Sequence, residues 1–239
     1  IGGAPKRLYS GTSPRSMLGT TVSDEWKNAG FAGKVASIAL KDRAAIYMGG
    51  HRADVVLWHN PETFAWMSSQ RYFPDGKLPG WVEEMNAELV AEKGTKFDWT
   101  PTSPASGFSD DPFVPDAKFL WGMEPKFPHA MVKGLRRSLY SPYGVEITER
   151  LAERAIEKMG LGSGKGTDFL LVSLSTHDYL AHGFGPNSRE MEEITVAEDR
   201  EISKLLRAID RRVGLSNTLV ALTADHGGGH NPEYLAHHR

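Results

Sequence analysis

Two short clusters of acidic and imidazole side chains carry the strongest chemical signal in this sequence. Asp178 and His182 are four residues apart, and Asp225 and His226 are adjacent. Four residues span about one helical turn, so the first pair is expected on one helix face. The second pair can reach one ion if the chain bends at a strand end, and the glycines at 227–229 permit such a bend. Carboxylate and imidazole ligands suit zinc, with manganese and iron as alternatives.

Both clusters stand directly after apolar segments, at 168–174 and 217–223, that have the pattern of buried strands. Ligands in open α/β sheets gather at the carboxyl ends of strands, so this placement favours a shared site. Two ions held there about 3.5–4 Å apart would suit in-line phosphoryl displacement. Either cluster alone has an ordinary interpretation, as a chance spacing or a capping turn, whereas the combination favours metal binding. We interpret three nearby histidines as loop residues: His230, His237 and His238.

A third cluster, Lys41-Asp42-Arg43, follows the apolar segment 34–40. If the chain stays extended there, alternate side chains share a side, and Lys41 and Arg43 point the same way. An ammonium and a guanidinium together fit a dianionic phosphate better than a monoanion. The alternative is a solvated loop with ordinary surface charges, in which Asp42 is a cap or an ion-pair partner.

Composition limits the classes of protein that this sequence can represent. The 239 residues include 28 Lys and Arg and 30 Asp and Glu, a net charge of −2, which argues against general nucleic-acid binding. No apolar run approaches the roughly 20 residues that a membrane span needs. The sequence contains no cysteine, so any metal must be held by histidine, carboxylate, hydroxyl or backbone oxygen.

The first half of the chain is predicted to contain two helices and three strands. A helix is expected between Ser13 as its cap and Gly30 as its end, and another opens at Pro79. Strands are expected at 34–40 and, as a hairpin, at 54–58 and 63–67. The first helix should bury one apolar stripe: Leu18, Val22 and Trp26.

The second half has the pattern of strand, helix and strand, which implies a parallel sheet with helices packed on it. Helices are expected at 146–160 and 188–213, the latter capped by Asn187 with Glu190 completing a capping box. We predict 168–174 as a central strand and 217–223 as the strand that follows. Six of the 14 prolines lie between residues 101 and 128, which predicts an irregular insertion or lid.

The motifs resemble those of a known superfamily. Residues 178–188 read Asp-Tyr-Leu-Ala-His-Gly-Phe-Gly-Pro-Asn-Ser, and residues 223–227 read Thr-Ala-Asp-His-Gly. Both resemble the alkaline phosphatase superfamily, in particular its type I phosphodiesterase/nucleotide pyrophosphatase branch. Ala39-Leu40-Lys41-Asp42-Arg43-Ala44 and Ser13-Pro14-Arg15 are similar to the atypical bacterial alkaline phosphatases of that branch, which hydrolyse phosphomonoesters. The resemblance runs from about Ser13 to Arg239.

The resemblance implies an α/β fold, with a mostly parallel central sheet and helices on both faces. Residues 1–239 would form part of one catalytic domain, with the insertion at about 100–135. Two zinc ions are implied, one bound by Asp178 and His182 together with a later histidine. The second would be bound by Asp225 and His226, together with an early aspartate and a nucleophilic Thr or Ser. Lys41 and Arg43 would hold the phosphate oxygens.

The family's nucleophile and early aspartate precede the stretch that resembles Ser13-Pro14-Arg15, and its last zinc-binding histidine lies beyond Arg239. Thr12, Thr20 and Thr21 do not match the nucleophile segment. We therefore expect an internal fragment whose partners are the remaining N- and C-terminal segments of the same protein. On its own, such a fragment could be inactive.

For the whole protein, the resemblance implies zinc-dependent hydrolysis of phosphate monoesters through a phosphorylated Thr or Ser. The alternatives are a phosphodiesterase or nucleotide pyrophosphatase on the same scaffold, or a non-catalytic metal-binding fragment. A small phosphate ester is the expected substrate. A periplasmic or secreted location follows from the resemblance alone.

Overall fold

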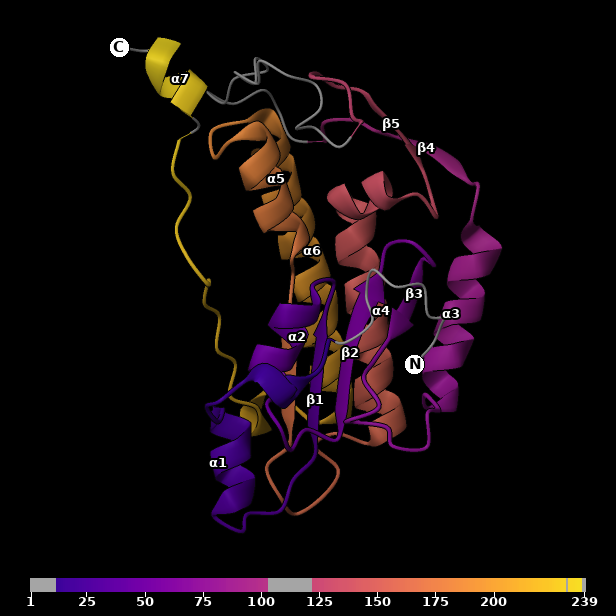
Figure 1. Ribbon diagram of the computed structural model, residues 1–239, viewed down its shortest axis with the longest axis vertical. Helices are drawn as coiled ribbons and strands as arrows, with labels where there is room; N and C mark the ends of the chain where they lie inside the picture. The colour runs from indigo at the N-terminus through magenta and orange to yellow at the C-terminus, as the bar shows by residue number, and fades with distance from the viewer. Residues whose placement is uncertain (1–11, 103–121, 231, 238–239) are drawn as a thin grey trace.

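A four-stranded sheet in the order β3-β2-β1-β6 forms the centre of this computed structural model, which describes residues 12–102, 122–230 and 232–237 (Figure 1). Its strands are β1 (Val35–Ala39), β2 (Val55–Asn60), β3 (Ala65–Met67) and β6 (Phe169–Ser173). Strands β1, β2 and β6 are parallel, whereas β3 is antiparallel to β2. The predicted strand at 34–40 and the predicted hairpin are confirmed.

Helices cover both faces of this sheet because β1 and β2 are apolar on both sides. Ile38 and Leu57 pack into the cluster shared with α3 and α4, whereas Ala39 and Trp58 pack against α2. All four side chains are at most 2 % exposed, which explains the unbroken apolar pattern of these strands. The helices are α2 (Asp42–Gly49), α3 (Gly80–Glu92) and α4 (Pro142–Met159). The predicted α/β fold is confirmed.

Strand β6 occupies the end of the sheet and not its centre. Among the described residues it pairs only with β1, and all five of its residues are half-exposed. The prediction that it is a central strand is therefore wrong.

The predicted strand at 217–223 is also wrong. Residue 217 ends a short 3-10 turn, η4 (Leu215–Asn217), and the chain then runs on without strand pairing, with Leu219 95 % exposed. Apolar composition alone does not make a strand, because a strand also needs a hydrogen-bonded neighbour.

The predicted helix from Ser13 to Gly30 is two separate elements. Ser13 does act as a cap, accepting a hydrogen bond from the Arg15 N–H at 3.1 Å, but only for the short turn η1 (Pro14–Ser16). A new helix, α1 (Val22–Asn28), begins at a capping box of Thr21 and Asp24. The expected apolar stripe is not buried, since Leu18 is 100 % exposed. Leu18 lies between η1 and α1 and belongs to neither, so it cannot continue the stripe of α1.

Two helices follow β6: α5 (Thr176–Phe184) and the long α6 (Arg189–Arg212). The predicted capping box of α6 is wrong. The hydroxyl of Ser188, and not the side chain of Asn187, accepts a hydrogen bond from the Met191 N–H. Glu190 is turned inward, where its Oε1 lies 2.9 Å from Nε2 of the fully buried His129. The Glu190 carboxylate therefore contacts the buried His129, far away in the sequence, and does not cap the helix as the local pattern predicted.

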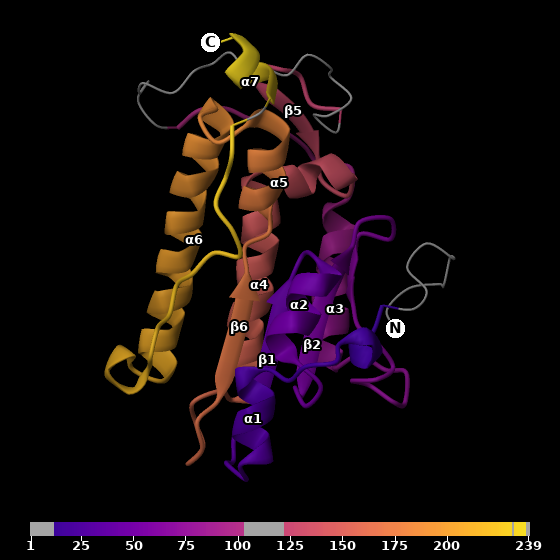
Figure 2. The ribbon, with the colours of Figure 1, turned by 60° about the vertical axis from the view of Figure 1, so that its left-hand side comes forward.

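A second, two-stranded sheet lies at the end of the molecule where α5 and α7 (Pro232–His237) are found (Figures 1 and 2). Its antiparallel strands are β4 (Lys96–Trp99) and β5 (His129–Val132), which stand on either side of the proline-rich stretch. Residues 103–121 of that stretch lie outside the described residues, so the insertion at about 100–135 stays a prediction. In the part of the chain that is described, no helix combines the length and apolarity required to cross a membrane.

Candidate metal centre

Parallel pairing of β1 and β6 brings two distant loops together. Ala39 and Ser173, the last residues of these strands, are paired in register. Because the strands are parallel, the segments that follow them leave the sheet at the same edge. The loop after β1 carries Lys41, and α5 after β6 carries Asp178. The Lys41 ammonium donates a hydrogen bond to Oδ2 of Asp178.

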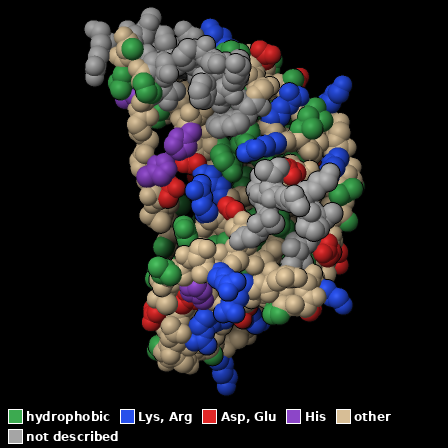
Figure 3. Space-filling model, in the orientation of Figure 1, with side chains coloured by type: hydrophobic (Ala, Val, Ile, Leu, Met, Phe, Trp, Pro, Cys, Tyr) green, Lys and Arg blue, Asp and Glu red, His purple; other side chains and the backbone are tan. Residues whose placement is uncertain are grey.

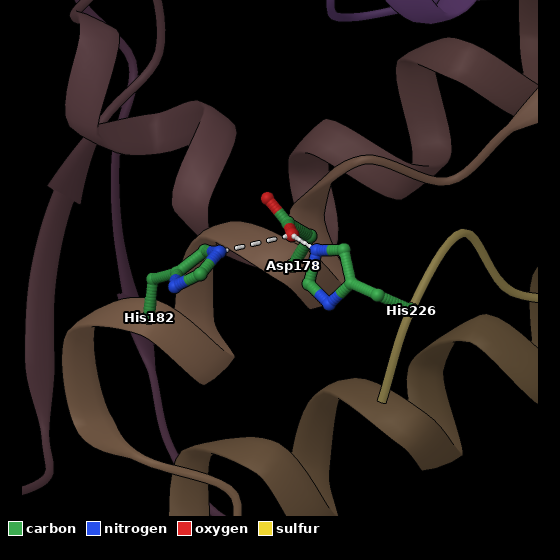
Figure 4. Close-up of side chains that lie close together, drawn as sticks. All are labelled: Asp178, His182 and His226. Atoms are coloured by element: carbon green, nitrogen blue, oxygen red, sulfur yellow. Dashed lines mark ion pairs between the residues drawn. The ribbon is translucent and has the colours of Figure 1, made fainter. Parts of the chain in front are cut away.

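The other oxygen of Asp178 faces two imidazoles (Figure 4). Oδ1 lies 3.2 Å from Nε2 of His182 and 3.1 Å from Nε2 of His226. One ligand atom from each of the three residues lies within 4.8 Å of the others, which makes this group a possible metal site. The expectation that Asp178 and His182 share one face of a helix is confirmed. Figure 3 shows histidine side chains gathered beside acidic and basic ones on this face of the molecule.

Asp225 lies beside this group but outside it. Its side chain is 74 % exposed, and its Oδ1 accepts a hydrogen bond from the backbone N–H of His226 at 3.0 Å. Nε2 of His226 lies 3.1 Å from Oδ1 of Asp178 and 3.6 Å from Oδ2 of Asp225, so one imidazole borders both carboxylates. The assignment of Asp225 and His226 to a second ion stays a prediction.

Neighbouring charges alter the titration of this group. Partial burial acts to raise the pKa of Asp178, but the Lys41 ammonium and the two imidazoles outweigh it and hold that pKa below its ordinary value. The pKa of His226 is raised, first by the hydrogen bond between Nδ1 and the Gly227 carbonyl, then by the charges of Asp225 and Asp178. Asp178 is thus ionised and ready to bind a cation well below neutral pH.

Arg43 does not extend this group. Helix α2 begins at Asp42, so Lys41 is its N-cap and Arg43 lies in its first turn. The expectation that the chain stays extended through Arg43 is wrong, because the helix begins at Asp42. Arg43 is exposed, and within the described ranges no ion pair involves its side chain. Its contact with phosphate stays a prediction.

Sequence reasoning missed one aromatic residue at this site. The ring centroid of Tyr179 lies 4.7 Å from the Lys41 ammonium nitrogen. Tyr179 stands next to Asp178 within the motif, so its position was visible in the sequence. Its contact was not, because only the approach of β1 to β6 brings Lys41 over the ring.

Known proteins resemble this chain over nearly its whole length. The family model for type I phosphodiesterase/nucleotide pyrophosphatase matches residues 8–238. The chain belongs to this family. Within it, the Asp178–His182–His226 group lies on the two motifs that carry the sequence resemblance.

The curated relatives of this chain include alkaline phosphatases. The chain is 37 % identical to alkaline phosphatase PhoV of Synechococcus elongatus, over 93 % of this chain and 42 % of that protein. It is 33 % identical to alkaline phosphatase PafA of Elizabethkingia meningoseptica, over 95 % of this chain and 43 % of that protein. The crystal structure of wild-type PafA superposes with a TM-score of 0.76 at 31 % identity, over 95 % of this chain and 45 % of that one. The chain thus spans less than half the length of these relatives.

The donor set of this family member fits a zinc ion. Asp178 supplies a carboxylate oxygen, and His182 and His226 each supply an imidazole nitrogen. Carboxylate oxygen and imidazole nitrogen are both ligands that zinc takes in proteins. The two imidazoles already converge on a single oxygen, and the exposure of His182 (66 %) and His226 (52 %) leaves that point accessible from solvent.

Proposed function

We propose that the protein is a metal-dependent phosphatase of this family that hydrolyses phosphate monoesters. The observation that carries the proposal is the meeting of Lys41 with Asp178, beside the two imidazoles that share the other carboxylate oxygen. A cation adjacent to a set of metal ligands is an arrangement that can bind a phosphoryl group from two sides. The similarity to two alkaline phosphatases supports the same conclusion.

The metal component of the proposal is two zinc ions. Asp178 and His182 would hold one, and Asp225 and His226 the other, with further ligands from other parts of the protein. Bound zinc supplies Lewis-acid activation of a phosphoryl oxygen and lowers the pKa of a bound hydroxyl group. The position of His226 against Asp178 agrees with two ions that lie close together, since one imidazole borders both ligand pairs.

The phosphate component rests on Lys41 and Arg43. In the proposed reaction Lys41 donates hydrogen bonds to the phosphoryl oxygens and balances their charge. Arg43 joins it from the first turn of α2 once substrate is bound. A monoester carries two negative charges and a diester one, so a second cation favours the monoester.

The nucleophile in this proposal is a Thr or Ser contributed by a part of the protein outside this chain. Its hydroxyl oxygen forms a bond to phosphorus as the bond to the leaving alcohol breaks, and water then hydrolyses the phosphorylated side chain.

We propose a periplasmic or secreted location for the whole protein, by likeness to its family.

The test compares a monoester and a diester that share one leaving group, with the full-length protein. Lys41→Ala is expected to lower kcat/KM for the monoester by about tenfold or more, with a smaller loss for the diester. Lys77→Ala, an exposed lysine in the loop before α3, is the matched control and should leave both values unchanged. Equal losses on both esters would contradict the phosphate contact.

Diester hydrolysis is the second candidate function, because the matched family takes its name from type I phosphodiesterases. The same pair of substrates distinguishes the two, since a diesterase shows the larger kcat/KM with the diester. A non-catalytic, metal-binding role would be indicated if the full-length protein bound zinc tightly and hydrolysed neither ester.

A further inference from the structure

The ammonium of Lys41 is held from two directions by consecutive residues of α5. Asp178 accepts its hydrogen bond through Oδ2, and the ring of Tyr179 lies 4.7 Å from the nitrogen. A lysine side chain has four rotatable bonds and gives up much conformational freedom when its end is fixed. A carboxylate on one side and an aromatic face on the other restrict the ammonium to one place.

The Tyr179 ring is itself held in place by a second tyrosine. Tyr140 packs edge-on against it, with ring centroids 4.9 Å apart and planes at 74°, and is 1 % exposed. The hydroxyl of Tyr140 accepts a hydrogen bond from Nε of Arg136 at 2.8 Å. Both residues belong to the short turn η3 (Arg136–Tyr140), which precedes α4. The orientation of the ring under Lys41 is therefore set from a third part of the chain.

Turn η3 is also attached to the start of α5. The Thr176 hydroxyl donates a hydrogen bond to the carbonyl of Leu139 at 3.0 Å, and both residues are buried. The Cβ of an alanine at Gly144, in the first turn of α4, would lie 2.3 Å from that same carbonyl oxygen, so the packing here is close. These contacts tie η3 to α5 and so help to fix the relative positions of Tyr140 and Tyr179.

The two contacts of Lys41 differ in what they do to its charge. The Asp178 carboxylate neutralises the ammonium, whereas the Tyr179 ring attracts it through its quadrupole and adds no negative charge. A cation oriented by a neutral ring remains attractive to a doubly charged phosphoryl group. The ring can thus orient Lys41 without lowering its affinity for an anion.

We propose that Tyr179 is a positioning residue that aims the Lys41 ammonium at the substrate's phosphoryl group, and so supports selectivity for monoesters. This inference rests on the proposed function, in which Lys41 contacts the phosphoryl oxygens. Tyr140 packs against the Tyr179 ring, and Arg136 donates a hydrogen bond to the Tyr140 hydroxyl, so both help to hold the ring in place. The ring acts through Lys41 and does not touch the reacting atoms.

A double-mutant cycle in the full-length protein tests this role. Tyr179→Leu is expected to lower kcat/KM for a monoester about three- to tenfold, the size of a partly exposed cation–π contact, and for the matched diester less than twofold. In the Lys41→Ala background the same substitution should have no further effect. Tyr179→Phe keeps the ring face and should recover most of the loss. Tyr47→Leu, which removes an exposed tyrosine on α2, is the matched control.

A spectroscopic readout tests the contact independently of activity. Protons on the carbon next to the Lys41 nitrogen should resonate upfield of ordinary lysines, because that nitrogen lies over the Tyr179 ring, 4.7 Å from its centroid. Tyr179→Leu should remove this displacement, and Tyr179→Phe should keep it. An ordinary Lys41 resonance, an equal loss on both esters, or losses that add in the double variant would overturn the inference. A protein that shows the displacement but no monoester hydrolysis would contradict the proposed function alone.

Discussion

Lys41 and Asp178 form an ion pair although 137 positions separate them in the sequence. The pair exists because β1 and β6 are parallel neighbours, so that both residues emerge at one edge of the sheet. The two oxygens of the Asp178 carboxylate have different partners. Oδ2 accepts a hydrogen bond from the Lys41 ammonium, and Oδ1 faces His182 and His226. Asp178 therefore links a candidate anion-binding residue to a candidate metal site.

Removal of the Asp178 charge should weaken metal binding. We expect Asp178→Asn to lower the zinc affinity of this chain by at least tenfold, because the amide is a poor ligand and both imidazoles lose their shared anion. Competition with a chromogenic chelator measures the affinity. Asp75→Asn, in an exposed turn, is the control. An unchanged affinity would exclude Asp178 as a ligand.

The grouping of His226 with Asp178 makes a second prediction. In this chain, His226→Ala should weaken zinc binding about as much as His182→Ala. Asp225→Ala should have the smaller effect, because that side chain is 74 % exposed and the second ion proposed for it needs further ligands from other parts of the protein. The same chelator competition applies to all three variants. The opposite order, with Asp225 essential and His226 dispensable, would contradict the grouping of His226 with Asp178.

Glu149 should make the folded state less stable as the pH rises. It is 5 % exposed on α4, and burial, followed by the charges of Glu153 and Glu201, raises its pKa to about 7. Between the ordinary pKa and about 7 the native state binds the extra proton, so this part of the stability is lost as the pH increases. Glu149→Gln should therefore stabilise the protein at pH 9, by about 1–3 kcal/mol, and much less at pH 4.5.

Thermal unfolding at the two pH values measures that difference. Glu84→Gln, which removes an exposed carboxylate on α3, is the matched control and should leave the melting temperature unchanged at both. A Glu149→Gln variant that is equally stabilised at pH 4.5 and pH 9 would refute the raised pKa.

The buried pair of Glu190 and His129 should contribute to stability through its hydrogen bond. Both side chains are at most 2 % exposed, and the ring of His129 contacts Phe127 and Phe184. Glu190→Ala leaves the imidazole nitrogen without a partner and should cost about 2–4 kcal/mol in the free energy of unfolding. Glu190→Gln, which still offers an acceptor, should cost clearly less. Denaturant titration separates the two, and equal costs would indicate that volume alone matters.

Local patterns in the sequence were sufficient for several elements and for one pair of site residues. The spacing of Asp178 and His182 places them on one helix face because a helix turns once in 3.6 residues. The apolar run at 34–40 and the hairpin between 54 and 67 appear as predicted, since strands buried on both faces must be apolar throughout. These features depend on neighbours within one element, so backbone geometry determines them.

Contacts between distant segments were decided by the tertiary structure. Strand pairing puts Lys41 on Asp178 and over the ring of Tyr179, and the course of the chain after α6 puts His226, but not Asp225, against the same carboxylate. The apolar run at 217–223 does not form the strand that it predicts. The chain through Arg43 is not extended, because α2 begins at Asp42. Sequence by itself determined which side chains are suited to bind metal and phosphate and the local elements that carry them. Only the packing of β1 against β6 and the path of the chain after α6 decided which of these side chains meet, because those contacts join residues that no local periodicity relates.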